Sequence, residues 1–111
     1  MEKIYRLLWT KSAEDDLLNI IEHIKDDSPK NAKTVYARIK KHAASSNFFP
    51  LKGRVLPELQ QEGITLYREV VVTPWRIIYK VGDDTVYIMA IIDSRQNVED
   101  ILLQKLLRRA V

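Results

Sequence analysis

The sequence predicts an α+β fold in which an antiparallel sheet carries an N-terminal helical hairpin and a C-terminal helix. Two apolar stripes at helical spacing follow one another with a very short link between them. Runs of apolar and β-branched residues separated by short turns come next, and these predict antiparallel strands. A short strand precedes the first helix and an amphipathic segment closes the chain, so the predicted order is β-α-α-β-β-β-α. A length of 111 residues suits a single domain, 1–111.

The N-terminal half accounts for the helical hairpin. The segment Ile4–Trp9 is short and rich in β-favouring residues, which predicts the first strand. Thr10 or Ser12 can cap the first helix, and the acids that follow suit its first turn. Ser28-Pro29 then starts a second helix, with serine as the cap and proline at the first helical position. Because the connection is so short, the two helices are expected to lie antiparallel.

The C-terminal half accounts for the sheet and the last helix. The connection Ser45–Gly63 contains two prolines and two glycines, and loops of this length are often functional or mobile. Gly82-Asp83-Asp84 suits a tight hairpin turn, and Thr73-Pro74 suits a turn position. The predicted strands and final helix are Leu66–Val72, Trp75–Val81, Val86–Asp93 and Val98 to about Arg109.

The final helix is apolar over a wide arc, so it has to be covered on more than one side. Two arrangements provide that cover. A partner chain can pack on the helix, or the helix can lodge between the sheet and the helical hairpin.

Composition excludes several classes of protein. Hydrophobic residues make up 46% and charged residues 30%, the balance of a soluble globular protein. The absence of cysteine excludes disulfides, thiol catalysis and thiolate metal sites. The N-terminus lacks the pattern of a secretory signal and no run is apolar enough for a membrane helix, so the cytosol is the expected compartment and no membrane association is expected. The net charge of +3 suits RNA, DNA or an acidic protein partner.

Familiar catalytic and cofactor motifs are missing from the sequence. His23 and His42 both fall on predicted helices, where histidines are more often surface or packing residues than metal ligands. No HExxH, glycine-rich phosphate loop or GxSxG is present. Neither a metal nor another cofactor is therefore expected.

The strongest candidates for a site are the four arginines between residues 54 and 95. Arg68 and Arg76 lie on consecutive predicted strands, and pairing of those strands can bring them side by side. Like charges placed together are unfavourable unless an anion lies between them, which predicts an anion site. In the alternative interpretation each arginine extends to water or pairs with an acid of the chain, such as Glu69, Asp83 or Asp93. The predicted anion-binding or target-binding residues are Arg54, Arg68, Arg76 and Arg95.

Nearly the whole chain resembles the RelE/ParE toxins of bacterial type II toxin–antitoxin modules. The most specific feature is the order and spacing of YRE, WRIIY and SRQN. The segments that carry the resemblance are SAEDDLLNIIEHIKDDSPKNAKTVYARI, FPLKGRVLPEL, LYREVVVTPWRIIYKV and VYIMAIIDSRQNVEDIL.

The resemblance implies one of two activities. RelE-like toxins are endoribonucleases that cleave mRNA on the ribosome with basic residues of the sheet, and Arg68, Arg76 and Arg95 fall where those residues stand. Val70 replaces a second basic residue of that set, and Ile101 stands where a tyrosine is expected. Arginine is a poor proton donor, and Tyr67 or Tyr79 can take that role only if oriented into the site.

These substitutions favour a ParE-like toxin that inhibits DNA gyrase and has no intrinsic catalysis. Two further interpretations are a chain that retains only antitoxin binding and a plain nucleic-acid-binding domain. The family resemblance implies a cognate antitoxin as partner, in a toxin–antitoxin hetero-oligomer or beside a toxin homodimer. The residues expected to contact the antitoxin are Tyr36, Ile39, Arg68, Arg76, Leu103 and Leu107.

Overall fold

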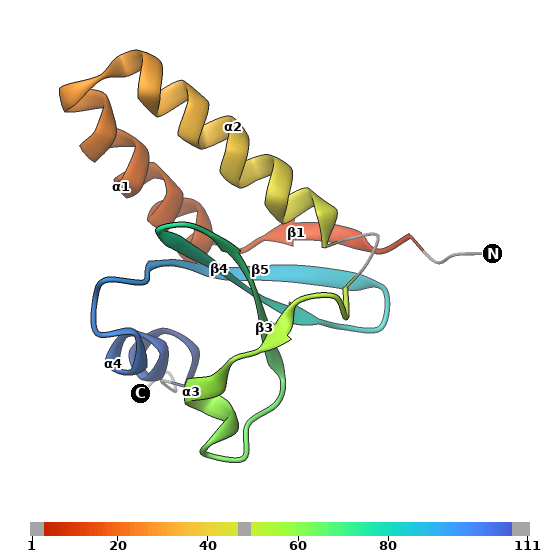
Figure 1. Cartoon of the computed structure of the whole chain (residues 1–111). Coiled ribbons are helices and arrows are strands. Elements are labelled where there is room, and N and C mark those ends of the chain that lie inside the picture. The colour runs from red at the N-terminus through yellow and green to blue at the C-terminus, as the bar shows by residue number, and fades with distance from the viewer. Residues whose placement is uncertain (1–3, 47–49, 108–111) are drawn as a thin grey trace.

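The computed structural model describes residues 4–46 and 50–107 and confirms the predicted α+β class. One five-stranded sheet runs through the molecule in the order β1-β5-β4-β3-β2 (Figure 1). The strands are β1 (Arg6–Trp9), β2 (Arg54–Val55), β3 (Tyr67–Val72), β4 (Trp75–Val81) and β5 (Thr85–Asp93). The helices are α1 (Lys11–Asp27), α2 (Pro29–Ser45), α3 (Pro57–Gln60) and α4 (Val98–Leu102), followed by a π-helical turn, Leu103–Leu107.

The sheet is mainly antiparallel, as predicted. β2, β3, β4 and β5 pair antiparallel, and β1 pairs parallel with β5 at the edge of the sheet. The helical hairpin leads from β1 at one edge of the sheet to β2 at the other edge. The two-residue turn at Thr73-Pro74 pairs Val72 with Trp75 and thereby sets the register of β3 and β4.

The long connection differs from the prediction because it contains two short elements, β2 and α3. β2 adds to the edge of β3, and α3 is a single turn that begins at Pro57. Elements of two and four residues are too short to show any periodicity, so they cannot be predicted from the sequence pattern.

The helical hairpin forms as predicted. Thr10 caps α1, because its Oγ1 accepts the amide hydrogen of Ala13 at 3.2 Å, and Ser28 caps α2 by accepting that of Asn31 at 3.2 Å. The hairpin covers one face of the sheet, called here the hairpin face (Figure 1). No helix within residues 4–46 and 50–107 is both long and apolar enough to cross a bilayer. The core of this face is formed by Ala13, Leu17, Val35, Ile39, Ala43, Val72, Ile77, Tyr79, Val86, Ile88 and Ile91.

The opposite face is covered by α3 and α4 and is called here the α3/α4 face (Figure 1). Leu56 at the start of α3 and Leu59 within it pack with Leu102 of α4 over Ile78 of the sheet. The C-terminal helix therefore does not lodge between the sheet and the hairpin, and that alternative is wrong. It lies on the other face, and Lys105 beyond it forms an ion pair with Asp16 of α1 across the end of β5. The predicted end of the helix near Arg109 lies outside the described residues.

Candidate functional site

The predicted pairing of Arg68 with Arg76 on a common patch is wrong, because the two side chains lie on opposite faces of the sheet. Arg68 stands opposite Tyr79, whose side chain belongs to the core of the hairpin face. Arg76 stands opposite Val71, which lies an odd number of residues, three, from Arg68 along β3. Since side chains alternate along a strand, Arg76 points to the α3/α4 face and Arg68 to the hairpin face.

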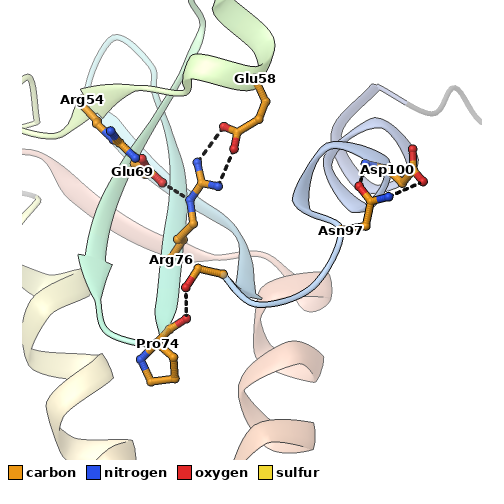
Figure 2. A network of polar contacts seen from close by, with 8 residues as sticks. Arg54, Glu58, Glu69, Pro74, Arg76, Asn97 and Asp100 are labelled. Carbon is orange, nitrogen blue, oxygen red and sulfur yellow. Dashed lines mark hydrogen bonds and ion pairs between the residues drawn. The ribbon is translucent and has the colours of Figure 1, made fainter.

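Arg76 is the centre of an ionic cluster, which is defined here as Arg54, Glu58, Glu69 and Arg76. Its side chain is only 7% exposed. Nη1 and Nη2 donate to the two carboxylate oxygens of Glu58 at 2.7 and 2.8 Å, and Nε donates to Glu69 (Figure 2). The side chain of Glu69 is fully buried, and its other oxygen accepts from Nε of Arg54.

The contact between Arg76 and Glu58 keeps both of these side chains charged at neutral pH. The hydrogen bonds from Arg76 hold the pKa of Glu58 below its usual range. The carboxylate of Glu58 in turn raises the pKa of Arg76, with Glu69 adding to the effect against the cost of burial. Buried charges are tolerated in proteins only when they are paired in this way. The anion that the sequence requires beside Arg76 is therefore supplied by the chain itself.

Arg68 and Arg95 have quite different surroundings. Nη1 of Arg68 donates to the carbonyl oxygens of Gly53 at 2.8 Å and Leu51 at 3.3 Å, so Arg68 holds the long connection against the sheet. Arg95 is 74% exposed and forms a double hydrogen bond with Asp93 at 2.9 and 2.6 Å. The hydrogen bonds from Arg95 hold the pKa of Asp93 at about 2. Arg76 pairs with Glu69 and Arg95 pairs with Asp93, as the alternative interpretation of the sequence predicts.

Tyr79 is committed to the long connection. Its hydroxyl donates to the carbonyl oxygen of Pro50 at 2.6 Å and accepts from the amide of Gly53 at 3.0 Å. Burial raises the pKa of this phenol, so the neutral form that makes both bonds is favoured. Gly53 is required here, because a Cβ at that position would lie 2.6 Å from the backbone oxygen of Glu69 and would also clash with the Tyr79 ring. Tyr79 therefore points into this connection and is not aimed at Arg76.

The residues expected to contact an antitoxin separate into surface and core. Tyr36 on α2 is 43% exposed and Leu103 is 40% exposed, so both offer apolar surface. Ile39 is completely buried between α2 and the sheet, and we assign it to the core, because a side chain without exposed surface cannot meet a partner. Arg76 is nearly buried and offers very little surface to a partner. The side chain of Leu107 lies outside the described part of the chain.

Two important residues escaped the sequence analysis, Glu58 and Gly53. Glu58 lies 18 positions before Arg76, within a connection that shows no periodic pattern. The available signal was the PEL tripeptide, in which proline starts a helical turn and places an acid in it.

Comparison with known proteins identifies the family of this chain. A family model described as the ParE toxin of the type II toxin–antitoxin system, parDE, matches residues 7–98. The chain belongs to the ParE toxin family. As a member of the RelE/ParE superfamily it is a toxin of the ParE type, and the resemblance seen in the sequence is confirmed.

Solved structures share the fold of this ParE-family toxin. The chromosomal ParDE toxin–antitoxin system of P. aeruginosa matches with a TM-score of 0.67 at 19% identity, over 81% of this chain and 96% of that chain. The toxin–antitoxin complex RelBE2 of Mycobacterium tuberculosis matches with a TM-score of 0.57 at 20% identity, over 84% of this chain and 94% of that chain. No curated protein sequence matches the chain.

Proposed function

We propose that this ParE-family toxin inhibits DNA gyrase by binding to it, as the growth-inhibiting half of a plasmid-stabilising toxin–antitoxin module in the bacterial cytoplasm. A cognate antitoxin neutralises it. The observation that carries the proposal is the ionic cluster, in which all three side-chain nitrogens of Arg76 donate to Glu58 and Glu69 of its own fold. A toxin whose central arginine is neutralised in this way is better suited to protein binding than to phosphate chemistry.

Cleavage of RNA makes demands that these residues meet poorly. To hold a scissile phosphate, Arg76 would first have to release both oxygens of Glu58, which would leave a nearly buried guanidinium without that partner. A general acid or base is also required. Arginine cannot serve as one, and the hydroxyl of Tyr79 is buried in its contacts with Pro50 and Gly53.

The exposed residues of the chain suit contacts with other proteins. Arg95 extends from the end of β5 into solvent, and we place it at the target surface. Tyr36 and Leu18 are large apolar side chains left exposed on the helical hairpin, and we place them under the antitoxin. Exposed apolar surface of this kind is typical of a partner site on a small monomeric protein. The toxin and antitoxin then form a hetero-oligomer.

The test compares two assays on the purified chain. Purified gyrase is assayed for supercoiling of relaxed plasmid with and without the chain, and ribosomes are assayed in parallel for cleavage of a bound mRNA. We expect a stoichiometric excess of the chain to abolish supercoiling by gyrase. The ribosome-bound mRNA should stay intact. Arg95→Ala should weaken the inhibition, and Lys25→Ala on the exposed face of α1 is the matched loss of a cation elsewhere. Ribosome-dependent cleavage that requires Arg95, with unimpaired gyrase, would overturn the proposal in favour of an mRNA interferase.

A further inference from the structure

The two helices of the hairpin carry opposite charge. α1 contains six acids and two lysines, whereas α2 contains four lysines, one arginine and no acid. With histidine neutral, the formal charge is therefore −4 for α1 and +5 for α2. Because the two helices lie side by side (Figure 1), the hairpin has an acidic side and a basic side. A negatively charged partner is attracted to the α2 side and repelled by the α1 side.

Three of the lysines form one line along α2, called here the basic face: Lys30, Lys33 and Lys41. Steps of three or four residues return to the same side of a helix, and Ala37 occupies the step between Lys33 and Lys41. All four residues are exposed, and the buried residues of α2 lie on its opposite side. Lys30 and Lys41 are about 16 Å apart along the helix axis, so the line covers three turns.

The basic face is not neutralised by the chain. Within residues 4–46 and 50–107, none of its three lysines forms an ion pair. The other two cations of α2 are engaged. Nη2 of Arg38 donates to the carbonyl oxygen of Thr73 at 3.0 Å, and Nζ of Lys40 lies 4.1 Å from the ring centroid of Trp9 and 5.7 Å from that of Tyr36. The flank with Tyr36, which we place under the antitoxin, is thus distinct from the basic face.

The residues around the lysines favour a nucleic acid over a protein or a membrane. Exposed neighbours on this side of α2 are small, namely Thr34, Ala37 and Ala44. Protein interfaces depend on large aromatic or arginine anchors, and helices that lie on membranes use Trp, Phe or Leu. The basic face also has no aromatic ring on which the bases of a single strand can stack. A duplex, which presents closely spaced phosphates on its outside, needs only the ammonium groups.

The acids of α1 do not cancel this attraction at physiological salt. Packed helix axes lie about 8–10 Å apart, and a duplex on the basic face lies on the far side of α2. Its phosphates are therefore further from α1 than the Debye length of about 8 Å. Each phosphate contact releases counterions and contributes about −0.9 to the slope of log K against log salt concentration. Three contacts predict a slope of about −2.7.

We propose that the basic face of α2 binds the phosphate backbone of duplex DNA without reading its sequence. Each of the three lysines contacts a phosphate oxygen, and α1 is turned away from the DNA. The contact depends only on the charges of the hairpin. The choice of DNA over duplex RNA rests on the proposed function, because gyrase works on DNA and a toxin bound to that DNA meets its target there.

The test titrates a fluorescently labelled DNA duplex of about 16 base pairs with the full-length chain and follows its anisotropy. We expect a micromolar dissociation constant at about 50 mM salt and a loss of affinity of about fortyfold at about 200 mM. Absence of binding at the lower salt concentration, or a slope near zero, would overturn the inference. Tighter binding to the matching single strand, to an RNA duplex or to phosphatidylserine vesicles would do so as well.

Two matched double variants locate the contact. Lys33→Gln with Lys41→Gln should bring the slope to about −1 and weaken binding at about 50 mM salt by tenfold or more. Lys11→Gln with Lys25→Gln on α1 gives the same net charge and should bind within about twofold of the wild type. All four lysines are exposed, so both variants should fold, which circular dichroism checks. Equal weakening by the two would show that only net charge matters and would contradict the inference.

Gyrase inhibition is measured on the same proteins to keep the two proposals apart. A chain that inhibits gyrase but ignores the duplex refutes this inference alone. A chain that binds the duplex through α2 but spares gyrase refutes only the proposed target.

Discussion

Arg68 and Arg76 lie on neighbouring strands, but the sheet gives them opposite roles. On the α3/α4 face, Arg76 is nearly buried and is held by the carboxylates of Glu58 and Glu69. On the hairpin face, Arg68 is partly exposed and bonds only to backbone carbonyls of the long connection. A basic residue at a position that is functional in relatives can therefore have a structural role instead. The partners of the side chain, and not its place in a motif, decide between the structural and the functional role.

The largest effect is expected for Arg76→Ala. It leaves the fully buried carboxylate of Glu69 with Arg54 alone, and breaking a buried ion pair costs about 3–5 kcal/mol of the free energy of unfolding. Chemical denaturation of the purified variant measures this cost. A loss below about 1 kcal/mol would mean that Arg76 is not the structural residue described here.

The next effect sharpens the view of the hairpin face. Gly53→Ala forces a methyl group against the Tyr79 ring and the backbone oxygen of Glu69, and overpacking of this kind costs about 1–3 kcal/mol. Tyr79→Phe in the same background should not restore stability, because the backbone contact remains. Thermal unfolding of both variants tests this, and a stable Gly53→Ala chain would show that the connection is not pinned.

The contribution of Glu58 should depend on pH. Because its pKa in the folded protein is lowered from 4.5, its carboxylate stabilises the fold above that pH, and the stabilisation is lost as the pH falls through the lower folded pKa. Glu58→Gln keeps the shape but loses the charge, and it should cost about 1–2 kcal/mol at pH 7. Urea denaturation from pH 7 to pH 3 should show the two chains converging below about pH 4.5. A constant difference across that range would contradict the ion pair.

The smallest effect is expected for Arg68→Ala, which is the matched control for Arg76→Ala. Hydrogen bonds from a partly exposed side chain to two carbonyls contribute about 1 kcal/mol or less, since water can replace the donor. Denaturation under the same conditions gives the ratio of the two arginine effects. Equal losses would remove the distinction between the two faces.

Much of the fold could be predicted, and the reason is local. The caps at Thr10 and Ser28 and the apolar periodicities depend on residues close in sequence, so the helical hairpin and the long strands follow from them. β2 and α3 could not be predicted, because a strand of two residues and a helix of four carry no period.

The faces on which Arg68 and Arg76 lie could have been predicted, although we expected both side chains on the same face. A two-residue turn at Thr73-Pro74 pairs Val72 with Trp75, and that register alone puts Arg68 and Arg76 on opposite faces. The contact of Glu58 with Arg76 was different, because it depends on how the connection folds back over the α3/α4 face. Long-range contacts of this kind are specified by packing and leave no local pattern.

We propose that Arg76 serves the fold and takes no part in binding phosphate. The side-chain Nε–H signals of arginine report it directly in an NMR titration of the full-length chain, first with inorganic phosphate and then with a short single-stranded RNA. We predict that the Arg76 signal keeps its position and its slow exchange with water throughout both titrations. A saturable shift of that signal, with faster exchange of the Nε–H with water as the contact with Glu58 is lost, would contradict this proposal.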